Sequence, residues 1–196
     1  AVLRAPAAAV NESDAQERTA LHLAALGGHA AVCMALLDLR AFVEASARDG
    51  HGHTALHYAA ARGHAEVCRC LSEHRRFPDV DAASIFGHTA LHSAAECPDD
   101  GAAEASYVEA CRVLLDCPRF TVAAACDLRG RTALHVAAAA GRAGVCGLLL
   151  EHPRALECIT VRDDLDRLAV DVASGEHTRR LFPAAAPPRP RGGGFA

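Results

Sequence analysis

The sequence predicts an all-α solenoid, in which short units of two antiparallel helices stack side by side. The tetrapeptide Thr-Ala-Leu-His occurs four times, and its copies start 35, 35 and 43 residues apart, at Thr19, Thr54, Thr89 and Thr132. A second apolar run with the i, i+1, i+4, i+5 spacing of a helical face follows each copy. Each unit is too small to bury its own apolar face, so neighbouring units must cover it.

The first helix of each unit begins at the tetrapeptide. Thr is a good N-cap, because its hydroxyl can accept a hydrogen bond from a backbone N–H of the first turn. The His three residues later, as in Thr54 and His57, can complete a capping box, because an imidazole nitrogen can accept a bond from the backbone N–H of the Thr. Glycines such as Gly63 offer the left-handed residue that ends this helix.

With these features the chain resembles the ankyrin repeat family. The stretch DGHGHTALHYAAARGHAEVCRCL, residues 49–71, matches the pattern of that family, and the resemblance covers roughly residues 14–175. It implies an L-shaped solenoid joined by β-hairpin-like loops, with hairpin tips and first helices lining a concave face. It also implies a protein partner, and it does not imply enzymatic activity.

The predicted organisation is four repeats, a degenerate C-terminal capping repeat and two flanking segments. The boundaries are 1–13 (N-terminal arm or end of a preceding repeat), 14–48, 49–83, 84–126, 127–162, 163–182 (cap) and 183–196 (Pro/Gly-rich tail). In the cap, Leu168-Ala169-Val170-Asp171 replaces the tetrapeptide, so we expect its hydrogen bonds to be lost there. An insertion at 97–107 is expected to lengthen the link between the two helices of the third repeat, either as a contact site or as neutral surface.

The end of the second helix departs from the family pattern. Arg40, Arg75, Pro118 and Pro153 stand where the family has Gly, and Pro cannot adopt the positive φ that Gly supplies. We therefore expect this helix to end differently, with a longer elbow. The recurring Phe42, Phe77 and Phe120 are interpreted as core residues that seal it.

Composition excludes several classes of function. The formal net charge is -4, and every basic residue is Arg, so phosphate-binding lysines and lysine Schiff bases are excluded. No basic stripe is obvious, so no nucleic-acid partner is expected. No apolar run reaches the 18 residues of a membrane span.

The nine cysteines are not interpreted as a disulfide framework. Cys33, Cys68, Cys111 and Cys146 occupy one equivalent position, a full repeat apart and too distant to bridge. Reduced core thiols favour a reducing intracellular compartment, the cytoplasm or, alternatively, an organelle such as a plastid after presequence removal. Cys97 and Cys117 are the cysteines outside this position that we expect to be exposed.

No metal, cofactor or catalytic group is predicted. His64, Cys68, Cys70 and His74 resemble a zinc set, but Cys68 and Cys70 lie about 200° apart on one helix and cannot face one ion. The repeated histidines are expected to cap helices and the repeated cysteines to pack, which leaves no Cys-His nucleophile.

Binding residues are instead expected at the hairpin tips and at the position before each Thr. The apolar pair Ile85-Phe86 at a tip is either the anchor of an interface or folded under a neighbour. Arg18, His53, His88, Arg131 and Arg167 form a column that would favour an acidic partner, although Arg is common there in the family. The predicted partner-binding residues are Arg18, His51, His53, Arg62, Ile85, Phe86, His88, Leu128, Arg129, Arg131, Leu165 and Arg167.

Two functions remain open from the sequence. The chain is either an adaptor or scaffold whose concave face binds a protein, or a structural subunit of a large assembly, with an organelle as one location, held by its tails and inserted loop. Regulation by thiol oxidation is a third possibility.

Overall fold

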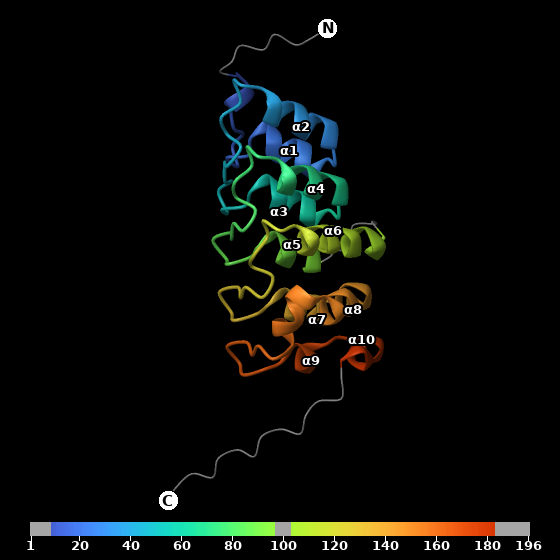
Figure 1. Cartoon of the computed structure of the whole chain (residues 1–196). Helices are drawn as coiled ribbons and strands as arrows, with labels where there is room; N and C mark the ends of the chain where they lie inside the picture. The colour runs from blue at the N-terminus through green and yellow to red at the C-terminus, as the bar shows by residue number, and fades with distance from the viewer. Residues whose placement is uncertain (1–8, 97–102, 183–196) are drawn as a thin grey trace, which may run out of the picture.

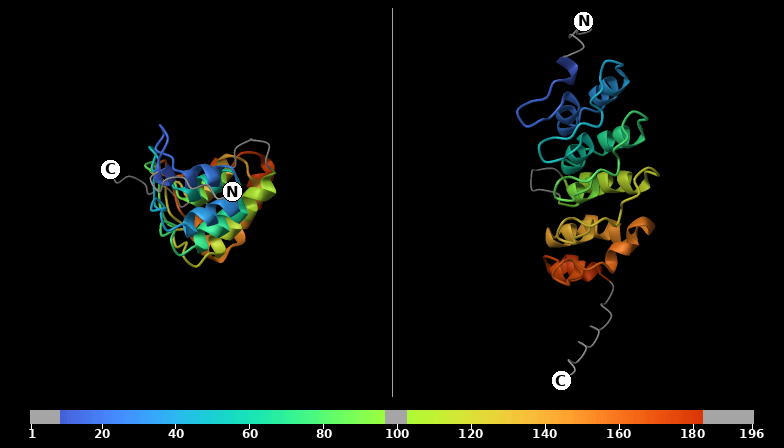
Figure 2. Two further views of the ribbon diagram at one scale, coloured as in Figure 1. Left: turned by 90° about the horizontal axis from the view of Figure 1, so that it is seen from above. Right: turned by 90° about the vertical axis from the view of Figure 1, so that its left-hand side faces the viewer.

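The computed structural model describes residues 9–96 and 103–182, and its helices form successive antiparallel pairs stacked in single file (Figure 1). The pairs are α1 (Ala20–Leu26) with α2 (Ala30–Asp38), α3 (Ala55–Ala61) with α4 (Ala65–Glu73), α5 (Ala90–Glu96) with α6 (Glu104–Asp116), α7 (Ala133–Ala139) with α8 (Ala143–Glu151), and α9 (Ala169–Val172) with α10 (Glu176–Leu181). Two 3₁₀ segments, η1 (Ala9–Asn11) and η2 (Pro153–Ile159), complete the elements. The hairpin loops project from one side of the stack (Figure 2), which confirms the predicted all-α solenoid.

A continuous core of small apolar side chains runs through the stack. Phe42, Phe77 and Phe120 are fully buried, as predicted for the elbow. The repeated cysteines Cys33, Cys68, Cys111 and Cys146 are also fully buried. Burial raises the pKa of the Cys68 and Cys146 thiols to about 12, so these groups stay protonated and pack as small apolar side chains.

Two expectations about the third unit were wrong. Residues 104–107 do not belong to a loop: they form the first turn of α6, where Tyr107 is fully buried between helices. Cys117 is not exposed but buried, with its thiol directed at the Ser72 carbonyl 3.8 Å away. Cys97, the rest of the inserted loop at 97–102 and the tail at 183–196 lie outside the described residues.

The repeated Thr and His do more than cap their own helix. The Thr54 N–H donates to the His57 Nδ1 at 3.1 Å, which leaves the proton of the neutral ring on Nε2. The His57 Nε2–H then donates to the carbonyl of His88, in the next hairpin, at 2.8 Å. Equivalent bridges join His22 to His53, His92 to Arg131 and His135 to Arg167, all at 3.0 Å. One side chain thus caps a helix and ties two successive units together.

The degenerate cap keeps half of this arrangement. The Asp171 carboxylate accepts a bond from the Leu168 N–H at 2.8 Å, so the bond at the start of α9 is retained, contrary to the expectation that it would be lost. A carboxylate has no proton with which to bridge to a further unit.

Arginines explain how the second helices end without glycine. Arg119 Nη1 donates to the carbonyls of Ser72 and His74 at 2.8 and 3.1 Å, and Nη2 donates to the Phe77 carbonyl. These carbonyls lie at the end of α4 and in the elbow of the preceding unit, where no intrahelical donor is available. Arg76 and Arg154 make the same three contacts with the elbows before them. We call these three residues the arginine staples.

Arg119→Ala should lower the free energy of unfolding by about 1.5–3 kcal/mol, the range for hydrogen bonds to charged groups. Arg112→Ala, which removes an exposed Arg from the outer surface of α6, is the matched control and should change stability by less than about 0.5 kcal/mol. Urea denaturation measures both. Equal effects of the two substitutions would show that the staple is only a surface contact.

Acid should destabilise the stack through the buried histidines. Desolvation lowers the pKa of His57 and His92 from 6.5 to about 4, so the unfolded chain binds protons that the folded chain does not. Stability should therefore be constant above about pH 7 and fall as the pH drops from about 6.5 towards 4.

The control for this pH dependence is the double substitution His57→Gln and His92→Gln. Gln can accept the capping bond but cannot titrate, so this variant should be less stable at pH 7 and lose much less stability on acidification. Urea denaturation at a series of pH values tests this. An unchanged pH slope in the variant would contradict the assignment to these imidazoles.

Candidate protein-binding surface

An Asp carboxylate builds most of the hairpins. The Asp127 Oδ1 accepts bonds from the backbone N–H groups of Arg129 and Arg131 at 2.8 and 2.9 Å. Asp14, Asp49 and Asp163 do the same in their own hairpins, at 2.8–3.0 Å. Such side-chain-to-backbone bonds hold the turn without a strand partner.

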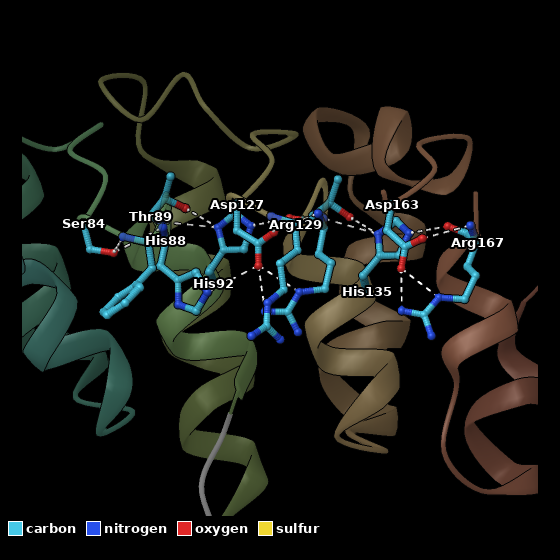
Figure 3. A network of polar contacts seen from close by, with 12 residues as sticks. Ser84, His88, Thr89, His92, Asp127, Arg129, His135, Asp163 and Arg167 are labelled. Atoms are coloured by element: carbon cyan, nitrogen blue, oxygen red, sulfur yellow. Dashed lines mark hydrogen bonds and ion pairs between the residues drawn. The ribbon is translucent and has the colours of Figure 1, made fainter. Parts of the chain in front are cut away.

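The same carboxylates neutralise the predicted column of cations, as Figure 3 shows for Asp127 and Asp163. Arg131 and Arg167 each lie 2.7 Å from the carboxylate four residues earlier. Arg18 pairs with Asp14 at 2.7 Å, and His53 lies 3.5 Å from Asp49. The column presents paired charges, which removes the sequence-based reason to expect an acidic partner.

These pairs hold the pKa of the carboxyls down. Hydrogen bonding from Arg167 lowers the pKa of Asp163 to about 2. Burial alone would raise the pKa of Asp127, but the hydrogen bonds from Arg131 and Arg129 outweigh it, and the pKa is lowered. Both groups are ionised at neutral pH and keep their partners.

The third hairpin is the exception. Ser84 replaces the Asp, and its hydroxyl accepts the two backbone N–H bonds only at 3.3 Å. His88 therefore has no acid in its own hairpin and lies 3.4 Å from Asp127 of the next one. Its ring stacks on His92, with centroids 5.5 Å apart and planes at 8°.

Backbone hydrogen bonds connect the hairpin tips to one another. The Ile85 N–H donates to the His51 carbonyl, and the Leu128 N–H donates to the Phe86 carbonyl, both at 3.0 Å. This close approach requires glycine at position 87, where φ is +78° and a Cβ would lie 2.9 Å from the Leu128 nitrogen. The tips form a continuous edge whose amides are already bonded.

Four large apolar side chains are exposed on this edge. Ile85 is 57% exposed, Phe86 49%, Leu128 73% and Leu165 70%. The structure thus excludes the alternative that Ile85 and Phe86 fold under a neighbour. We call these four residues the apolar tip patch. Beside it lies a hollow of about 190 Å³ lined by Phe86, His88, Asp127, Leu128, Arg129 and Arg131.

The other predicted binding residues lie at different distances from this patch. The His51 ring is 6.1 Å from the Phe86 ring and extends the patch towards the second hairpin. Arg129 is exposed at its rim. Arg62 is exposed at the end of α3, on the first helix. Arg18 lies in the first hairpin, two hairpins before Ile85, and is not brought to the patch.

Comparison with known proteins agrees with this architecture. A family model described as ankyrin repeats (3 copies) matches residues 2–82, 39–104 and 79–163. The chain belongs to the ankyrin repeat family. A comparison with curated proteins found no significant match. Ankyrin repeats are in general protein-protein interaction modules, and the family is typically non-enzymatic.

Two further observations concern the described part of this ankyrin protein. Within residues 9–96 and 103–182, no group of three or more His, Cys, Asp or Glu side chains could hold a metal ion. In the same ranges, no helix is both long enough and apolar enough to cross a membrane.

Sequence reasoning missed a second hollow, between the first helices of the ankyrin units at α3 and α5. Tyr58 lies on its wall and donates to the Asp49 Oδ2 at 2.6 Å. Burial and this bond raise the pKa of Tyr58 to about 12. The signal was available, since Tyr58 stands where the other units have Leu23, Ser93 and Val136.

Ser84→Asp should stabilise the protein. Asp49 and Asp127 are about as buried as Ser84, so the site accommodates a carboxylate, which would shorten both turn bonds and face His88. We expect the free energy of unfolding to rise by about 0.5–1.5 kcal/mol, and Ser84→Ala to lower it by a similar amount. Urea denaturation at pH 7 decides this. A loss of stability in Ser84→Asp would show that the third hairpin is shaped for a hydroxyl.

Proposed function

We propose that this ankyrin protein is a non-enzymatic adaptor or scaffold that binds a protein partner on the hairpin edge of its concave face. The apolar tip patch is the observation that carries the proposal. A hairpin tip is ordinarily solvent-exposed and polar, yet three consecutive tips here expose Ile85, Phe86, Leu128 and Leu165. Large apolar side chains grouped on a surface are typical of protein interfaces.

The structure of the edge supports binding through side chains. The amides of Ile85 and Leu128 are bonded to the preceding hairpins, so a partner would gain little by adding a strand. A partner would instead bury the apolar side chains, with the Asp127–Arg131 and Asp163–Arg167 pairs at the rim. An apolar centre with a polar rim is the usual anatomy of an interface.

The chemistry of the buried groups supports a non-enzymatic role. The imidazole of His57 uses both ring nitrogens in structural hydrogen bonds, as does that of His92. Burial raises the pKa of the Cys33 thiol to about 11, which disfavours the thiolate that a nucleophile requires.

The double substitution Ile85→Asp with Phe86→Asp should abolish partner capture without unfolding the protein. Both side chains are exposed, so stability should change by little, whereas two charged groups at the centre of an interface should weaken binding at least about 100-fold. Affinity purification from the native source with quantitative mass spectrometry measures capture.

The matched control is Val43→Asp with Leu156→Asp. These residues are also exposed and apolar, but they lie at the elbows of the units rather than at the hairpin tips. The control should capture the same partner as the unmodified chain. Capture that survives the substitutions at the tips would contradict the proposal and favour a structural subunit held by other surfaces.

A further inference from the structure

The second hollow has a different chemistry from the apolar tip patch. It measures about 190 Å³ and lies between the first helices α3 and α5. Its lining consists of His53, His57, Tyr58, Ala61, His88, Ser93 and Glu96. Rings from the second and third units therefore form its walls, and small side chains leave the space between them.

Glu96 is the one charged group among these lining residues when the imidazoles are neutral. Its carboxylate is exposed at the end of α5, and within the described residues it has neither a hydrogen bond nor an ion pair. The carboxylates behind the rings are already matched, because Asp49 accepts from Tyr58 and Asp127 is paired with Arg131. Arg62, next to Ala61, already has an interaction of its own.

This combination occurs at one place among the described first helices. The residues equivalent to Ser93 and Glu96 are Leu23 and Leu26 in α1, and Val136 and Ala139 in α7. Neither of these pairs offers a carboxylate. The hollow is therefore a local feature of this chain and does not follow from the repeat architecture.

The two hollows adjoin through a shared residue. His88 lines both the hollow between α3 and α5 and the one beside Phe86 and Leu128. A protein segment that covers the apolar tip patch can therefore place a neighbouring side chain in the hollow between α3 and α5.

We propose that this hollow is a subsite for a basic side chain of the protein partner, an inference that rests on the proposed function. A cation placed here would donate a charge-assisted hydrogen bond to the Glu96 carboxylate and lie against the ring of Tyr58. An acidic side chain would be repelled by Glu96, and an apolar one would leave that carboxylate desolvated. The partner segment then combines large apolar residues for the tips with one Arg or Lys.

Small probes test the subsite without the partner. The full chain is titrated with N-acetyl-arginine methylamide while backbone amide chemical shifts are followed by NMR. We expect saturable shifts at Tyr58, Ser93 and Glu96, and about tenfold weaker binding of the neutral isostere N-acetyl-citrulline methylamide. N-acetyl-lysine methylamide shows whether the hollow prefers a guanidinium or an ammonium, and tighter binding of either basic probe supports the subsite.

Matched variants separate this subsite from the tip patch. Glu96→Gln should weaken binding of the arginine probe about tenfold, whereas Glu157→Gln, an exposed acid on η2, should leave it unchanged. Leu165→Asp disrupts the tip patch far from the hollow and should also leave binding of the arginine probe unchanged. Failure of the subsite and failure of the docking patch therefore give different results. The inference would be overturned if neither the arginine nor the lysine probe bound more tightly than the citrulline probe, or if Glu96→Gln left the binding of the basic probes unaffected.

Discussion

The hydrogen bond from a buried imidazole to the carbonyl of the next hairpin is the contact on which the rest of the structure depends. It requires one tautomer, because the Nδ1 of His57 must accept from Thr54 before Nε2–H can donate to His88. Repeated from α1 to α7, the bond fixes the distance between successive hairpins and holds their tips in file. The tip-to-tip amide bonds, and with them the exposed edge, follow from that spacing.

The ends of the second helices are tied to the next unit by a different chemistry. There the arginine staples donate to the carbonyls at the helix ends of the preceding unit. The elbow phenylalanines, whose carbonyls accept bonds from the staples, are fully buried. Neutral imidazoles at the starts of the first helices and guanidinium groups at the ends of the second helices leave the centre to small apolar side chains, which can pack closely because these polar groups are satisfied at the helix ends.

The repeated tetrapeptide predicted the helices, their order and the buried cysteines, because those features depend on local spacing. It did not predict the bridging role of His57, since the acceptor lies in the next unit and spacing within one unit does not show it. Arg119 was missed for the same reason, although its recurrence with Arg76 and Arg154 was visible in the sequence. The length of α6 was mispredicted because a departure from the repeat was taken to be a loop, whereas Glu104–Asp116 extends the helix and buries Tyr107.

The surface was predictable where composition alone is unusual, as at Ile85 and Phe86. The surface was not predictable where the role of a charged side chain depends on which residues lie next to it in space. The cationic column looked like a binding feature until Asp127 and Asp163 were found to neutralise it. Conversely, the sequence did not show that Glu96 lines a hollow together with aromatic rings from two units. Paired charges hold the hairpins in shape, whereas the Glu96 carboxylate at the end of α5 has no such pair within the described residues.

The protonation state of the four bridging imidazoles decides whether successive units are joined in this way. Long-range ¹H–¹⁵N NMR at pH 7 distinguishes the two neutral tautomers and the charged ring for each histidine. We expect His22, His57, His92 and His135 all to be neutral, to carry their proton on Nε2 and to exchange it slowly with solvent. Rings that are charged, protonated on Nδ1 or freely exchanging would show that the units are not joined in this way.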